Sequence, residues 1–94
     1  MLILGVARFK PGMQAQHEAL MSGLNAHMMQ PLNPRIRLAG PLLDDTGAPS
    51  GIFMLFEADS IEAVRHFVTD SPYVRADLYE RVEIDALQLE VGRL

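Results

Sequence analysis

The fold is decided by the stretch DDTGAPSGIFMLF, which spans residues 44–56. Its first part, residues 44–51, is dense in Asp, Gly, Pro and Ser, the residues that form turns. Its second part, Ile52 to Phe56, is an apolar run of strand length. A second run, Arg35 to Leu38, precedes the turn and alternates polar with apolar residues. The two runs predict a β-hairpin whose strands pair antiparallel.

The apolar run Ile52 to Phe56 contains no polar residue. A strand with one face in water would alternate, so we expect both of its faces to be covered. The chain has 94 residues and room for one domain, residues 1–94. If the helices cover one face, a second copy can cover the other, which predicts a homodimer joined through the sheet faces. The alternative is a face half-covered by loops.

The segments before the hairpin supply one strand and one helix. An apolar strand over Leu2 to Phe9 ends at the turn Lys10-Pro11-Gly12. Apolar residues at spacings of mostly three and four then predict a helix from Met13 to about Met29. Pro31 and Pro34 end this helix before the hairpin begins.

The segments after the hairpin supply a second helix and a last strand. Asp59 with Glu62 resembles a capping box, and the apolar stripe that follows predicts about three helical turns. Residues 70–73 break this helix, and one further helical turn is expected over residues 74–79. The last strand is expected over residues 82–91, where the alternation changes phase between Ala86 and Leu87 and predicts a bulge.

The resulting order is βαββαβ. This order predicts a ferredoxin-like α+β fold, an antiparallel sheet with both helices on one face. With a second copy on the bare face, the assembly is expected to be of the dimeric α+β barrel type.

Composition narrows the functional classes. Twelve acidic against eight basic residues give a net charge of −4, and no basic run appears, so nucleic acid is not an expected partner. The apolar runs are short and no targeting leader is apparent, so no membrane partner is expected and the predicted location is cytoplasmic. The sequence contains no cysteine, which excludes disulfides, thiolate nucleophiles and cysteine-bound metals. No specific metal-ligand spacing is present, and no cofactor is expected.

Three histidines are the first candidates for acid–base chemistry, because imidazole titrates nearest to neutral pH. His27 lies near the end of the first helix, on the side of Leu20 and Leu24, so it is expected to point toward the sheet. Its functional interpretation is a general acid or base, and the alternative is a helix C-terminal histidine favoured by the helix dipole. His17 is interpreted as a boundary residue of the apolar stripe and His66 as solvated.

The loop carboxylates Asp44 and Asp45 have two interpretations. Either could orient a histidine, yet Asp before Thr-Gly is equally what a hairpin loop uses for its own backbone hydrogen bonds.

The order and spacing of several stretches resemble the YciI-like family of YCII-related domains. The matching stretches are Ala39-Gly40-Pro41-Leu42-Leu43-Asp44-Asp45-Thr46-Gly47, Asp70-Ser71-Pro72-Tyr73-Val74 and Leu78-Tyr79-Glu80, with Lys10-Pro11-Gly12, Ala26-His27 and Val82-Glu83-Ile84 as further matches. The resemblance spans nearly the whole chain. It implies a small dimer of ferredoxin-like α+β fold, in agreement with the order of elements.

The resemblance also implies a pocket centred on a histidine and an aspartate, with dehydrochlorination of a chlorinated hydroxyquinol known for a member. Counted back from residues 39–41, the family histidine falls on His27. The family's usual Asp-Pro-Tyr or Asp-Pro-Phe is Ser-Pro-Tyr here, with an aspartate one place earlier. The expected catalytic residues are therefore His27, Asp70 and Asp45, and the expected substrate-binding residues are Tyr73, Ser71 and Asp44.

Three functions follow as hypotheses. The first is a cofactor-free enzyme of lyase, dehydrochlorinase or isomerase type, in which His27 removes a proton from a small cyclic or aromatic metabolite while an aspartate holds its tautomer. The second is a non-catalytic dimer, structural or binding a small molecule, which the serine at position 71 favours. The third, by fold analogy, is a cofactor-free quinol oxygenase, against which the absence of Trp argues.

Overall fold

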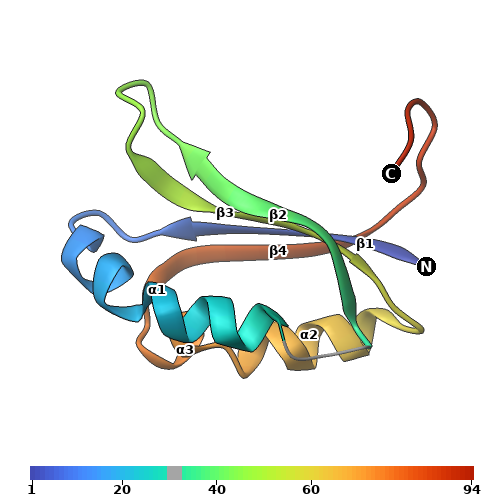
Figure 1. Ribbon diagram of the computed structural model, residues 1–94, viewed down its shortest axis with the longest axis horizontal. Coiled ribbons are helices and arrows are strands. Elements are labelled where there is room, and N and C mark those ends of the chain that lie inside the picture. The colour runs from blue at the N-terminus through green and yellow to red at the C-terminus, as the bar shows by residue number, and fades with distance from the viewer. Residues whose placement is uncertain (30–32) are drawn as a thin grey trace.

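A four-stranded antiparallel sheet forms one layer of the protein and the helices form the other, in a computed structural model that describes residues 1–29 and 33–94 (Figure 1). The sheet order is β2-β3-β1-β4. The elements are β1 (Leu2–Phe9), α1 (Gln14–Met29), β2 (Arg35–Leu43), β3 (Pro49–Glu57), α2 (Ile61–Thr69), α3 (Pro72–Arg75) and β4 (Tyr79–Leu87).

This order confirms the predicted ferredoxin-like α+β fold. The further helical turn expected over residues 74–79 begins earlier, as α3 over Pro72–Arg75. β2 and β3 pair antiparallel across the turn-rich loop, as predicted. The strand expected over residues 35–38 continues to Leu43, because the apolar residues that follow still pair with β3. In the described part of the chain, no helix is long and apolar enough to cross a membrane.

Two local predictions at the ends of elements were wrong. The N-cap of α2 is Ser60 and not Asp59, because the Ser60 hydroxyl accepts a hydrogen bond from the Ala63 N–H at 3.2 Å. The bulge expected between Ala86 and Leu87 is absent from the described pairing: β4 ends at Leu87, and its register shifts at the opposite end, opposite Arg8 and Phe9. The phase change in the apolar pattern therefore marks the end of the strand.

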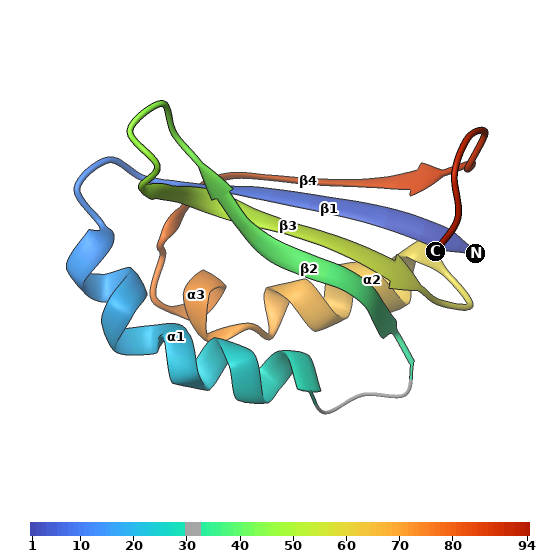
Figure 2. The same cartoon turned by 45° about the horizontal axis from the view of Figure 1, so that its top comes forward.

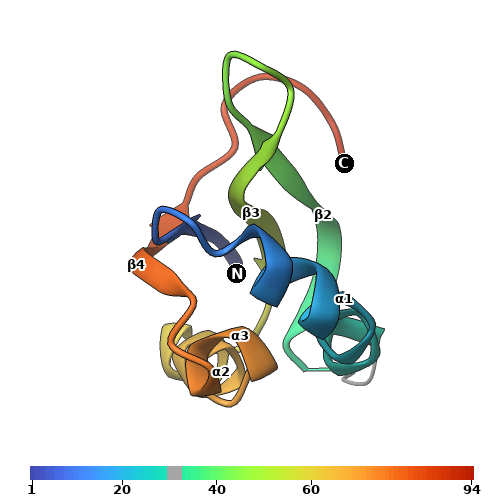
Figure 3. The ribbon, with the colours of Figure 1, turned by 90° about the vertical axis from the view of Figure 1, so that its left-hand side faces the viewer.

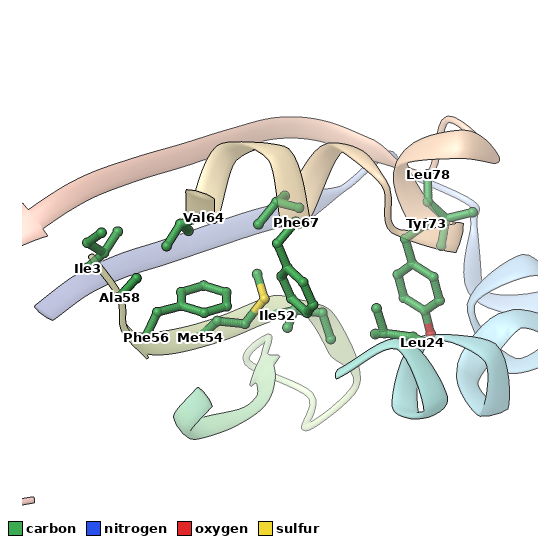
Figure 4. Packing of buried hydrophobic residues seen from close by; sticks show 11 residues of the cluster. Ile3, Leu24, Ile52, Met54, Phe56, Ala58, Val64, Phe67, Tyr73 and Leu78 are labelled. Atoms are coloured by element: carbon green, nitrogen blue, oxygen red, sulfur yellow. The ribbon is translucent and has the colours of Figure 1, made fainter. Parts of the chain in front are cut away.

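The two faces of the sheet differ in what covers them. Alternate residues of β1 and β3 point toward the helices, and Ile3, Met54 and Phe56 pack there with Val64 and Phe67 of α2 (Figure 4). The other face carries no helix (Figure 2). We call it the open face; by register, its apolar residues are Leu2, Leu4, Val6, Leu38, Leu42, Phe53, Leu55 and, at the end of β4, Leu87.

The edge strand β4 gives the open face a charged border. Arg81, Glu83 and Asp85 lie opposite Arg8, Val6 and Leu4 on that face. Arg81 and Glu83 form an ion pair at 2.8 Å. The open face thus has an apolar centre over β1, β2 and β3 and a polar rim along β4.

The helices divide the covered face between them. α2 lies under β4, whereas α1 lies under β2, the strand at the opposite edge (Figure 3). β2 turns Ala39 and Pro41 toward α1, because they pair with the inward-facing Met54 and Ile52, yet both remain exposed. A space therefore opens between α1 and β2.

Candidate functional site

A buried histidine and a buried tyrosine meet at the inner end of this space. His17 of α1 is only 7% exposed, and Tyr73 of α3 is fully buried. The Tyr73 hydroxyl lies 2.7 Å from Nδ1 of His17 and donates a hydrogen bond to the His17 carbonyl oxygen at 3.0 Å. One residue of α3 is thereby bonded to both the side chain and the backbone of α1.

The local sequence around α3 positions Tyr73. The Ser71 hydroxyl accepts a hydrogen bond from the Tyr73 N–H at 3.1 Å, and Pro72 occupies the first helical turn. This capped turn directs the phenol ring from α3 toward α1 (Figure 4). Ser71 itself is buried, at 4% exposure, and does not line the space beside α1.

An aromatic cluster surrounds the pair. The Phe9 ring lies 4.8 Å from the His17 ring and 5.9 Å from the Tyr73 ring, measured between centroids. Tyr79 stacks parallel to Phe9, at 6.0 Å. Burial raises the pKa of Tyr73 above the ordinary phenol value, and burial also raises the pKa of Tyr79 strongly. Both tyrosines are therefore neutral hydroxyls at neutral pH.

The space between α1 and β2 forms a pocket of about 270 Å³, which we call the α1–β2 pocket. None of its lining side chains is an acid, a lysine or an arginine, so it favours an uncharged, compact ligand. The lining residues are His17, Met21, Leu24, Asn25, Met28, Ala39, Gly40, Pro41, Pro49, Ile52 and Tyr73.

The second ring nitrogen of His17 is accessible. Among the described residues, no fully enclosed side-chain nitrogen or oxygen lacks a hydrogen-bond partner. Nε2 of His17 has no partner within that part of the chain, so it keeps some contact with solvent. His17 lines the α1–β2 pocket, so its imidazole ring borders a ligand there, as the amide of Asn25 does.

His27 has a different environment from the one the sequence predicted. Its Nε2 lies 2.8 Å from the carbonyl oxygen of Phe67, and its ring stacks on the Phe67 ring with centroids 4.3 Å apart. A carbonyl oxygen only accepts hydrogen bonds, so Nε2 of His27 carries the hydrogen and donates it. His27 thus binds the last turns of α2, and only Nδ1 remains for other contacts.

A hollow of about 310 Å³ brings His27 together with Asp70, and with His66, which is exposed as predicted. The Asp70 carboxylate accepts a hydrogen bond from Arg75, and this guanidinium lowers the pKa of Asp70 below the ordinary value. The nearby His27 lowers the pKa of Asp70 further, by a smaller effect. No hydrogen bond joins His27 to Asp70 in the described residues. The structure therefore places the predicted pair in one hollow without forming a dyad.

The loop carboxylates lie apart from both sites. Asp44 accepts hydrogen bonds from the Thr46 N–H at 2.8 Å, the Thr46 hydroxyl at 2.6 Å and the Ala48 N–H at 3.1 Å, and these bonds lower its pKa. Asp45 is exposed. Neither lines the α1–β2 pocket or the His27 hollow, and Asp44 has the turn-forming role that the loop sequence allowed. No group of three or more metal-binding side chains occurs in the part of the chain that the structure describes.

Of the predicted site residues, only Tyr73 lines the α1–β2 pocket, and sequence reasoning missed its partner. The expectation that His17 is a boundary residue was wrong, because the structure buries it. The available signal was its place in the stripe with Met13, Leu20 and Leu24, which packs inward.

Solved structures share this fold. 5-Chloro-2-hydroxyhydroquinone dehydrochlorinase from Burkholderia phenoliruptrix AC1100, in complex with 2,5-dihydroxybenzoquinone, matches with a TM-score of 0.83 at 24% identity, over 94% of each chain. A candidate antibiotic biosynthesis monooxygenase from Bacteroides thetaiotaomicron matches with a TM-score of 0.57 at 15% identity, over 100% of this chain and 92% of that one. An uncharacterized NIPSNAP domain protein from Burkholderia xenovorans matches with a TM-score of 0.57 at 16% identity, over 100% of this chain and 99% of that one.

No curated protein has a sequence that matches this chain. The family model for the YCII-related domain, in contrast, matches residues 1–88, from the first residue of the chain to just past the end of β4. That match covers every strand and helix described above, so the chain belongs to the family of YCII-related domains.

Proposed function

We propose that the protein is a cofactor-free acid–base enzyme of lyase, dehydrochlorinase or isomerase type, which binds a small cyclic or aromatic metabolite in the α1–β2 pocket. His17, in place of the expected His27, is the proton acceptor in this proposal. Asp70 and Asp45 have no part in it, because neither reaches the pocket.

One observation carries the proposal: an imidazole at the inner end of an apolar pocket has one nitrogen bonded to the protein and the other accessible. A general base must lie within hydrogen-bond reach of the proton that it removes, and Nε2 meets this requirement for a ligand in the pocket. His27 also has one bonded nitrogen and one remaining nitrogen, but the hollow that it lines is shared with the exposed polar side chains His66 and Asp70, so it lacks the apolar enclosure of His17.

The fold neighbour supports the choice of reaction class. That protein is a dehydrochlorinase, solved with a small dihydroxylated quinone. Dehydrochlorination removes one proton and one chloride from the substrate, so the reaction requires a proton acceptor beside the ring. The α1–β2 pocket offers that acceptor, and its uncharged lining suits a ring of this size.

We also propose that the protein acts as a homodimer joined through its open faces. The apolar centre of the open face and the charged rim along β4 have the anatomy of a protein interface. Of the two residues of the apolar run that point away from the helices, the second copy would cover Phe53, which is half-buried, whereas Leu55 is already buried in the single chain.

Chloride release from 5-chloro-2-hydroxyhydroquinone tests the proposed function directly. The wild-type protein should release chloride faster than the spontaneous background, and His17→Gln should lose at least about 100-fold in kcat, the scale of a general base. His66→Gln is the matched control and should retain wild-type turnover, because His66 is exposed and outside the pocket.

Binding keeps the test informative where turnover is absent. In a titration with 2,5-dihydroxybenzoquinone followed by NMR, the signals of His17 and Tyr73 should shift, while those of His66 should not. If His27→Gln abolishes turnover while His17→Gln retains it, the base is in the other hollow and the proposed site is wrong.

A non-catalytic binding protein is the second candidate, and one observation favours it. No carboxylate lines the α1–β2 pocket, so within the described residues His17 has no acidic partner to stabilise the imidazolium that proton removal forms. Shifts on binding 2,5-dihydroxybenzoquinone, with no turnover of the chlorinated substrate, would support this candidate over the enzyme.

A further inference from the structure

The Tyr73 hydroxyl makes two contacts with the same residue, and this restricts where its hydrogen can lie. Its oxygen lies 2.7 Å from Nδ1 of His17 and 3.0 Å from the His17 carbonyl oxygen. A phenol hydroxyl has one hydrogen to donate, together with lone pairs that accept. The carbonyl oxygen can only accept.

Only one arrangement makes both contacts favourable. If Tyr73 donated to Nδ1, its oxygen would lie 3.0 Å from the carbonyl oxygen with no hydrogen between them, and two lone-pair-bearing atoms would repel. If Tyr73 donates to the carbonyl, Nδ1 must carry a hydrogen and donate it to the Tyr73 oxygen, and both contacts are hydrogen bonds. The raised pKa of Tyr73 agrees with a protonated hydroxyl.

We infer that Tyr73 is a positioning residue that holds neutral His17 in the Nδ1–H tautomer, so that the lone pair of Nε2 faces the α1–β2 pocket. Tyr73 thus has the role that the sequence analysis assigned to an aspartate, which was to hold the tautomer of the histidine. The neutral phenol selects the tautomer through geometry alone, since it brings no negative charge to the imidazole.

The consequence for a ligand is specific. In this tautomer Nε2 accepts a hydrogen bond, so the pocket selects molecules that present a donor, such as a ring hydroxyl, at its inner end. In the opposite tautomer Nε2 would be a donor and would select a ring carbonyl instead. The catalytic role of this tautomer rests on the proposed function. The tautomer itself is a property of the protein without ligand and can be tested separately.

His27 provides an internal reference for the spectra, because its neutral tautomer is the opposite of the one inferred for His17. Its Nε2 donates to the Phe67 carbonyl, so neutral His27 is the Nε2–H tautomer. A single protein should therefore show two neutral histidines in opposite tautomers.

Long-range ¹H–¹⁵N correlation spectra of histidine-labelled protein at pH 8 test this without any substrate. His17 should show a protonated Nδ1 and an unprotonated Nε2, and His27 the reverse, with His17→Gln assigning the signals. A wild-type His17 that carries its hydrogen on Nε2 would overturn the inference, even if the protein proved to be an enzyme.

Two tyrosine variants separate positioning from packing. Tyr73→Phe should lose the Nδ1–H signature of His17 while the His27 signals stay in place, which also shows that the variant is folded. Tyr79→Phe removes a hydroxyl from the same cluster but none that contacts His17, so it should leave the tautomer unchanged. Retention of the Nδ1–H form in Tyr73→Phe would contradict the inference. If the chlorinated substrate is turned over, Tyr73→Phe should lower kcat about tenfold or more with little change in KM.

Discussion

His27 donates its Nε2–H to the carbonyl oxygen of Phe67 at 2.8 Å while its ring stacks on the side chain of that same residue. The bond joins residues that are 40 positions apart in the chain and ties the end of α1 to the last turns of α2. Carbonyls in the last turn of a helix lack partners within the helix, and a side-chain donor from a neighbouring helix can supply one. The structure thus gives this histidine a clear stabilising role.

Replacement of His27 by alanine should therefore destabilise the protein. Loss of the hydrogen bond and of the ring stack should cost about 1–2 kcal/mol, or roughly 5–15 °C in Tm for a domain of this size. Calorimetry of His27→Ala against His66→Ala measures the difference, since the exposed His66 should change stability by less than about 0.5 kcal/mol. Equal Tm values for the two variants would show that the contact with Phe67 contributes nothing.

The hairpin carboxylate Asp44 should make stability depend on pH in the acid range. Its pKa in the folded protein is lowered, first by the Thr46 hydroxyl and then by the backbone N–H groups of the loop. A lowered folded-state pKa means that the stabilisation is complete above the ordinary carboxyl pKa and is lost as the pH falls through the folded value. Asp44→Asn should lower Tm at pH 7 and flatten the Tm profile below pH 4, relative to Asp45→Asn. A steeper acid limb in Asp44→Asn would reverse the expected sign.

A charged residue on the open face should weaken the proposed dimer without unfolding the protein. Phe53→Glu places a carboxylate on the open face and should yield a folded monomer or a weakened dimer in light scattering, because a buried unpaired charge is costly. Val82→Glu is the control: it lies on the helix side of β4 and is 37% exposed. Met54→Glu tests unfolding instead, since Met54 points into the core at 4% exposure. A wild-type protein that is monomeric at micromolar concentration would contradict the dimer.

Two glycines of the hairpin strands should differ sharply in their tolerance of alanine. A Cβ at Gly51 would lie 2.3 Å from the carbonyl oxygen of Ala7, so β1 and β3 could not keep their present separation. Gly51→Ala should cost more than about 2 kcal/mol or prevent folding, as overpacking does. At Gly40 no atom lies within 4 Å of the new methyl group, so Gly40→Ala should be neutral or gain up to about 1 kcal/mol. Chemical denaturation of both variants provides the comparison.

The fold could be predicted from the sequence because its signals are local. The turn cluster before Ile52 and the stripe of α1 each indicate one element, and the order βαββαβ then leaves few topologies. The ends of elements were less predictable: Ser60 and Asp59 are both good caps, and only the actual path of the chain decides between them.

The site could be predicted only in part, because its defining contact is not local. His17 and Tyr73 are 56 residues apart, and their meeting depends on the short turn that Ser71 caps. His17 and His27 both lie on the helix predicted from residue 13 to 29, and nothing within that helix shows that one meets a hydroxyl and the other a carbonyl. Tyr73 lines the α1–β2 pocket, and its role in substrate binding stays a prediction; the histidine that it contacts is His17 and not the expected His27.

The position of the α1–β2 pocket at the margin of the sheet also bears on self-association. β2 is an edge strand, and an edge strand offers a row of backbone groups to which a foreign strand can add. Pro41 interrupts that row beside the pocket, because proline has no N–H to donate. A strand that added there would lie across the mouth of the pocket. The same proline that lines the ligand space thus protects its entrance from occlusion by aggregation.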